Sequence, residues 1–194
     1  MKSSLLNMVL SLGIITIVAA GLLSWVYTQT EAPIAKANLD KQIEAVKAVT
    51  PEFDNDPVAE AVEITPAGEE RVLKVFPARK GGELVGAAVE SYSSKGFSGD
   101  IKLIYGFDAA GTVTGYAVME HAETPGLGAK MDTWFGPEGK GNVIGLNAAE
   151  GELTVSKDGG QGDAITAATI TSRAFLDALN RASAAFAQLK AEEK

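Results

Sequence analysis

The sequence predicts an α+β protein in which one N-terminal transmembrane helix precedes a domain with a mainly antiparallel sheet and packed helices. Three observations support this class. An uncharged apolar stretch lies near the N-terminus, short β-rich segments fill the middle, and the last segment has helical periodicity. Successive strands followed by a long terminal helix are typical of an α+β layer arrangement. We expect a transmembrane anchor at 1–30, a juxtamembrane helix and linker at 31–57, and the folded domain at 58–194.

The N-terminal stretch predicts a membrane anchor. Residues 3–30 contain no charge, and the apolar part, 5–26, is long enough to cross a hydrocarbon core of about 30 Å. A signal peptide cleaved near Ala20 is the alternative, but the apolar run continues past that residue, which favours an uncleaved anchor. Lys2 before the span favours a cytoplasmic N-terminus, and Trp25 and Tyr27 at its end suit an aromatic belt at the far interface.

The middle of the chain predicts a helix and then a series of strands. Residues 37–49 have apolar positions on one helical side, so we expect a juxtamembrane helix that continues the membrane helix and ends before Thr50-Pro51. A hairpin loop is expected at 108–111, where a glycine stands near the position that needs a positive φ. The expected strands are 71–77, 83–92, 100–107, 112–121 and 152–155.

The last segment predicts an amphipathic helix behind a glycine-rich turn. Three glycines near residue 160 end any preceding strand. The expected apolar face consists of Phe175, Leu179, Ala182, Phe186 and Leu189. Thr169, Thr171 and Ser172 are candidate N-caps, and the unpaired N–H groups of a first helical turn attract an anion such as phosphate. Without further context these residues would only cap a helix.

Composition excludes several classes of function. The 25 acidic residues exceed the 17 basic ones, which argues against nucleic acid and anionic lipid as partners. The absence of cysteine excludes disulfides, thiolate iron–sulfur ligation and cysteine nucleophiles. His121 is the only histidine, so no multi-histidine metal site can form, and we interpret it as a structural residue. Redox chemistry would therefore need a borrowed cofactor.

Residues 163–169, Asp-Ala-Ile-Thr-Ala-Ala-Thr, resemble the flavinylation motif Asp-x-x-(Ser/Thr)-Gly-Ala-Thr of the FMN-binding domain family. The resemblance implies that FMN is joined to Thr169 through a phosphoester, installed by a separate flavin transferase. The other motif positions are Asp163, Thr166, Ala167 and Ala168. Ala167 stands where the family usually has glycine, and a positive φ at this position would strain its methyl group.

Residues 121–128, His-Ala-Glu-Thr-Pro-Gly-Leu-Gly, resemble a block found in electron-transport subunits that carry covalent FMN. The residues alone predict a tight loop whose N–H groups could approach a planar ligand. The resemblance implies that the loop lines the flavin. Its candidate positions are Glu123, Thr124, Gly126, Leu127 and Gly128. Glu123 either contacts the flavin or holds the loop by accepting hydrogen bonds from backbone amides.

Two further segments contain aromatic residues. Residues 94–100 resemble the aromatic-and-glycine turn that precedes the central hairpin in this family, and an ordinary surface loop is an equally good interpretation. Trp134 and Phe135 stand beside a turn, and we expect them to pack in the core rather than stack on flavin, because aromatic residues mostly act by burying area.

The resemblance covers nearly the whole chain and extends to the G-subunit family of Rnf complexes, which are ion-translocating ferredoxin:NAD oxidoreductases. It implies a single-pass flavoprotein of the bacterial inner (cytoplasmic) membrane with its flavin domain on the outer (periplasmic) side. Such a protein is not a stand-alone enzyme. It relays single electrons through FMN between other membrane and redox subunits of the complex.

Three alternatives remain. The C subunit of the sodium-translocating NADH:quinone reductase shares the motif and the anchor, although its chains are typically longer. A flavin-free, membrane-tethered assembly module would retain only its contacts with other subunits. Hydrolysis by a Thr169 nucleophile with His121 as base is disfavoured, because the sequence lacks an oxyanion loop and a nucleophile-elbow pattern.

Overall fold

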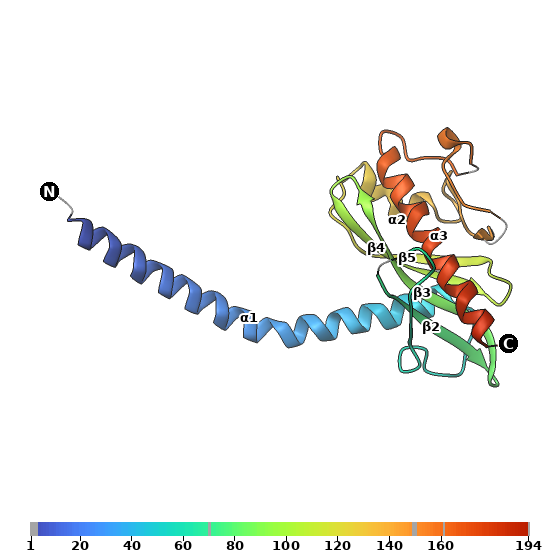
Figure 1. Cartoon of the computed structure of the whole chain (residues 1–194), viewed down its shortest axis with the longest axis horizontal. Coiled ribbons are helices and arrows are strands. Elements are labelled where there is room, and N and C mark those ends of the chain that lie inside the picture. Colours follow the sequence, from blue (N-terminus) through green and yellow to red (C-terminus); the bar gives the residue numbers. More distant parts are fainter. Residues whose placement is uncertain (1–3, 70, 149–150, 161, 194) are drawn as a thin grey trace. The chain divides into compact units, whose positions relative to one another are not determined.

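The chain forms two compact units, Met1–Lys41 and Gln42–Lys194, in a computed structural model that describes residues 4–69, 71–148, 151–160 and 162–193. The first unit contains most of α1 (Leu5–Val49), a 45-residue helix whose length and apolar composition suffice to cross a membrane (Figure 1). The juxtamembrane helix expected at 37–49 is the continuation of this same helix. It ends at Val49, before Thr50-Pro51, as the sequence predicts.

The second unit is built on a five-stranded antiparallel sheet in which each strand pairs with the next along the chain. The strands are β1 (Val62–Ile64), β2 (Leu73–Lys80), β3 (Glu83–Gly96), β4 (Gly99–Asp108) and β5 (Val113–Glu120). With α3 (Thr169–Glu192) packed on the sheet, this confirms the predicted α+β class. The hairpin loop at 108–111 is also confirmed, with Gly111 at φ +93°.

Two elements differ from the sequence prediction. The strand expected at 152–155 is wrong, because only Val155 makes a bridge, to Gly162, before the short 3₁₀ helix η3 (Ser156–Asp158). The Asn180 side chain of α3 instead binds both the N–H and the carbonyl of Leu153, at 3.0 and 2.9 Å. The missed strand β1 has three residues, too few to show a periodic pattern.

Helix α3 crosses one face of the sheet, mainly over β3 (Figure 1). All five residues of its predicted apolar face are buried. Phe175 lies at the centre of an aromatic cluster, stacked on Phe135 with ring centroids 4.0 Å apart and in edge contact with Tyr105 and Tyr116. The Tyr105 hydroxyl donates to the carbonyl of Phe175 at 2.7 Å. These contacts fix the first turns of α3 over the sheet.

The opposite face of the sheet packs against the end of α1. Val46 and Val49 are buried there with Phe76 and Ile104. Glycine is required beneath the helix end, because a Cβ on Gly106 would lie 1.9 Å from the carbonyl oxygen of Val49. The last turn of α1 is therefore part of the fold of the second unit.

Candidate functional site

A pocket of about 320 Å³ lies where three parts of the second unit meet. These parts are the tip of the β3–β4 hairpin, the loop after β5 and the N-terminus of α3. Its volume is at the lower end of the ~300–1,000 Å³ typical of small-molecule sites. The lining residues are Phe97, Glu123, Thr124, Leu127, Gly128, Ala167, Ala168, Thr169, Ile170 and Thr171.

The pocket joins the two sequence motifs, which lie about 40 residues apart along the chain. Seven of the ten site residues expected from the sequence line it. The other three, Asp163, Thr166 and Gly126, are exposed and do not line it. Asp163 is still held close to the core, because its carbonyl accepts a hydrogen bond from the Trp134 indole at 2.7 Å.

Two tight turns of the same kind contribute residues to the pocket lining. In the first, Leu127 N–H donates to the Thr124 carbonyl at 3.1 Å, with Gly126 at φ +75°. In the second, Ala168 N–H donates to the Ile165 carbonyl at 2.9 Å, with Ala167 at φ +62°. Positive φ at the third position is typical of a type II turn and normally requires glycine there. Ala167 therefore occupies a strained conformation, which meets the condition under which its methyl group was expected to cause strain.

Glu123 holds the three sides of the pocket together. Its buried carboxylate accepts hydrogen bonds from Ser98 N–H of the hairpin tip, at 2.9 Å, and from the Thr171 hydroxyl of α3. Gly128 packs directly on this pair, and a Cβ there would lie 2.5 Å from Glu123 Oε2 and 2.6 Å from Thr171 Oγ1. Of the two roles that the sequence left open for Glu123, these contacts favour holding the loop.

The N-terminus of α3 is open toward the pocket. The helix begins at Thr169 with Ala168 as N-cap, and no side chain of the described residues caps it. The three N-caps expected from the sequence are therefore wrong. The Thr171 hydroxyl binds Glu123, and Ser172 Oγ accepts from Ile165 N–H at 2.9 Å and donates to the Ala168 carbonyl at 3.0 Å. The first amides of the helix lack intrahelical acceptors and remain available to an anion.

Charged side chains lie beside this helix end. Lys157 of η3 has its ammonium 3.3 Å from the Thr169 hydroxyl. Arg173, one helical turn after Thr169, binds Asp158 through two hydrogen bonds of 2.7 and 2.8 Å. The Arg173 guanidinium holds the pKa of the Asp158 carboxyl below its ordinary value, mainly through these hydrogen bonds. The pair connects η3 to α3 and so fixes the position of Lys157.

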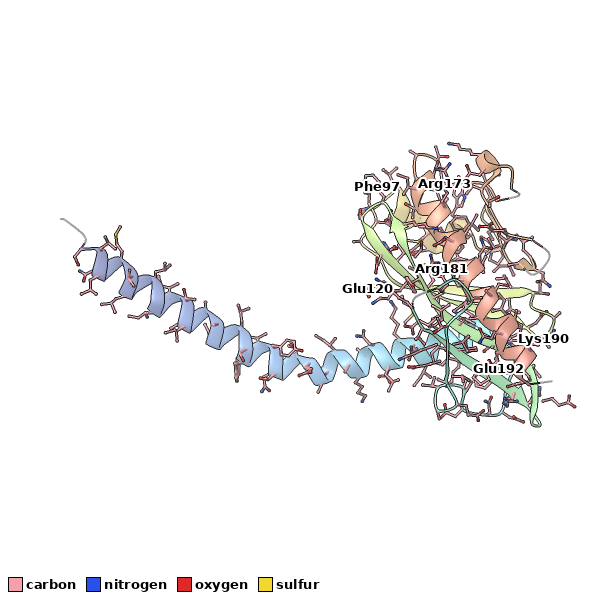
Figure 2. All side chains as sticks on the ribbon, in the orientation of Figure 1. Phe97, Glu120, Arg173, Arg181, Lys190 and Glu192 are labelled. Carbon is pink, nitrogen blue, oxygen red and sulfur yellow. The ribbon has the colours of Figure 1, made fainter. Side chains whose placement is uncertain are left out.

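The rim of the pocket is apolar and exposed. Phe97 at the hairpin tip is 68% exposed, Ile170 47% and Leu127 40%. Figure 2 shows Phe97 and Arg173 at the same end of the domain. The segment at 94–100 forms the turn of the β3–β4 hairpin rather than a turn preceding it, and its aromatic residue lines the pocket. Large side chains left in water beside a pocket indicate a surface that binds a ligand or partner.

Three other candidate residues have structural roles. The His121 imidazole accepts a hydrogen bond from Glu123 N–H at 3.1 Å, in agreement with the structural role expected for it. Phe135 is fully buried in the core, as predicted, and Trp134 packs against that core. Neither aromatic residue lines the pocket.

The FMN-binding domain profile matches residues 96–184, a range that contains every residue lining the pocket. The protein therefore belongs to the class with an FMN-binding domain. In this chain the domain follows an N-terminal helix that is long and apolar enough to cross a membrane.

Three relatives extend the match beyond this domain, and each is named as the G subunit of an ion-translocating oxidoreductase complex. The relative from Methanosarcina acetivorans is 39% identical over 91% of this chain and 91% of its own length. The Aliivibrio fischeri relative is 35% identical, covering 93% of this chain and 87% of the relative. That of Yersinia pestis is 38% identical, covering 84% and 81%. The chain belongs to the family of G subunits of ion-translocating oxidoreductase complexes.

Proposed function

We propose that the protein is the membrane-anchored flavoprotein component of an Rnf-type ion-translocating complex and carries FMN phosphoester-linked to Thr169. The observation that carries the proposal is the position of Thr169. Its hydroxyl lies at an uncapped helix N-terminus, on the wall of a pocket within an FMN-binding domain. A phosphate joined to Oγ1 would meet the free amides and the positive end of the helix dipole.

The chemistry of the pocket fits both ends of the cofactor. The phosphate end would lie at the first turn of α3. The ring end would contact the apolar rim formed by Phe97, Leu127 and Ile170, because a flat aromatic ring gains from burial against such side chains. When bound, the flavin supplies the electron-transfer chemistry, and the protein supplies binding, orientation and electrostatics.

The remaining motif residues shape the attachment loop. Thr166 and Ala167 form the exposed corner of a type II turn, where a modifying enzyme can reach them. Asp163 is exposed as well, while its backbone is held by Trp134. We assign to Asp163 and Thr166 recognition by the flavin transferase. Thr124 and Leu127 line the pocket and would contact the ring, while Gly126 supplies the positive φ that their turn requires.

The proposed placement follows from the anchor. Residues 1–30 span the cytoplasmic membrane with the N-terminus in the cytoplasm, 31–57 form the juxtamembrane helix and linker, and 58–194 form the flavin domain on the outer side. The relatives are named as subunits of a complex, so we expect other membrane and redox subunits of that complex as electron donors and acceptors. Covalent attachment suits the outer side, where dissociated FMN would be lost by dilution.

Thr169→Ala tests the attachment residue. In the full chain produced together with a flavin transferase, this variant is expected to lack the flavin fluorescence that the unchanged chain shows on a denaturing gel. Thr133→Ala is the matched control, because Thr133 is an exposed threonine that does not line the pocket, and we expect full labelling. Covalent flavin retained in Thr169→Ala would overturn the assignment. Absence of flavin from the unchanged chain would favour the flavin-free assembly module.

A further inference from the structure

Lys157 lies beside the proposed attachment residue but belongs to neither sequence motif. Its ammonium is within hydrogen-bond distance, 3.3 Å, of Thr169 Oγ1. Within 4–69, 71–148, 151–160 and 162–193, no carboxylate lies at ion-pair distance from this ammonium. The nearby Asp158 carboxylate feels the Lys157 charge but is held by Arg173. A cation beside a hydroxyl, with no carboxylate at ion-pair distance in these ranges, can take an anionic ligand at that hydroxyl.

The position of Lys157 is set by the neighbouring residues. Its sequence neighbour Asp158 is held by two hydrogen bonds from Arg173, so η3 is connected to the second turn of α3. The turn after η3 is also restricted, since Gly159 has φ +90° and a Cβ on Gly160 would lie 2.1 Å from the Thr154 carbonyl oxygen. The Arg173 guanidinium is already paired with Asp158, whereas the Lys157 ammonium lies beside the Thr169 hydroxyl.

We propose that Lys157 is the positioning residue for the phosphate of the flavin and makes the pocket prefer a phosphorylated flavin to an unphosphorylated one. This inference rests on the proposed function of the pocket. A lysine suits the role because its ammonium is a compact point charge with three donors on a flexible stem. Together with the uncapped amides of α3, it gives the phosphate end of the pocket positive character, while the rim toward Phe97 stays apolar.

The test compares FMN with riboflavin, which lacks the phosphate, on the full chain produced without flavin transferase. Binding is measured from the change in flavin fluorescence. Because Lys157 is exposed and its charge is screened by water, we expect the unchanged chain to bind FMN roughly five- to tenfold more tightly than riboflavin. Lys157→Met keeps most of the apolar stem and removes the charge, so the preference should fall below about twofold with riboflavin affinity unchanged.

Two controls separate the local charge from net charge. Lys157→Arg retains a cation and should retain most of the preference. Lys74→Met makes the same change in net charge on an exposed residue of β2. Its neighbour Val75 is in the core beneath α3, so Lys74 points to the other face of the sheet, and the variant should leave the preference intact. In the unchanged chain the preference should also weaken as ionic strength rises.

Each outcome decides one of the two claims. If Lys157→Met keeps the full preference for FMN, the role of Lys157 is overturned while the pocket stands as a flavin site. If the unchanged chain binds neither flavin, the flavin pocket itself is overturned, and the role of Lys157 with it. If Lys74→Met loses the preference for FMN over riboflavin as strongly as Lys157→Met does, the preference comes from net charge and the positioning role of Lys157 is overturned.

Discussion

Replacing Ala167 with glycine should stabilise the folded domain, in contrast to the usual effect of an alanine-to-glycine change. Ala167 has φ +62°, and an L-residue in this left-handed region costs about 1–2 kcal/mol. Against this gain, the greater freedom of glycine in the unfolded chain costs about 0.5–1 kcal/mol. Ala167 is exposed, so little apolar burial is lost with its methyl group. We expect the free energy of unfolding to rise by roughly 0–1.5 kcal/mol, the difference between these two effects, with a midpoint of about 0.7 kcal/mol.

The assay is urea unfolding of the full chain in detergent, in a Trp25→Phe background that leaves Trp134 as the only tryptophan. Its fluorescence reports on the loop because its indole donates to the Asp163 carbonyl. Ala110→Gly is the matched control, since Ala110 is also an exposed loop alanine but has a negative φ. It should lose about 0.5–1 kcal/mol. If Ala167→Gly lowers the free energy of unfolding as much as Ala110→Gly does, the positive φ carries no strain and the reasoning fails.

Two further predictions concern the scaffold around the site. Gly106→Ala should lower the free energy of unfolding by about 1–3 kcal/mol, because its Cβ would meet the Val49 carbonyl oxygen at 1.9 Å. Gly115→Ala, whose nearest such contact is 3.2 Å, should lower it less, and equal losses in urea unfolding would contradict this packing. Burial alone would raise the pKa of Asp177, but its hydrogen bonds, including one from Lys95, lower the pKa overall. Because the folded chain holds the ionised form more tightly than the unfolded chain does, the carboxylate stabilises the fold above a pH of about 4. The stability difference between the unchanged chain and Asp177→Asn should therefore shrink as pH falls below that value, and a difference independent of pH in acid titrations of unfolding would refute it.

Much of the fold could be predicted because its patterns are local. The face of α3 from Phe175 to Leu189 is buried as its spacing predicts, and the hairpin turn with Gly111 follows from its residues. The segment at 152–155 was misassigned because its partner is the side chain of Asn180, which lies far along the chain. Local sequence carries no signal for such a contact.

The site could be predicted only in part for the same reason. The motifs predicted the tight loop at 124–128 and singled out Thr169, which lines the pocket, but the N-cap rule failed at Thr171, whose hydroxyl binds Glu123 from another segment. Lys157 reaches the site through the fold of η3, and nothing in its immediate sequence indicates this. Phe97 was not among the predicted site residues, because its segment resembled only a turn before the central hairpin and was equally well interpreted as a surface loop.

The central claim is that this chain carries FMN on Thr169, and peptide mapping by mass spectrometry tests it most directly. The full chain is produced with a flavin transferase, and trypsin cleavage after Lys157 and Arg173 releases a single peptide, 158–173, that contains the whole attachment motif. Our account predicts that this peptide gains the mass of FMN less one water, with fragmentation assigning the added mass to Thr169. An unmodified peptide, or flavin on any other residue, would contradict it.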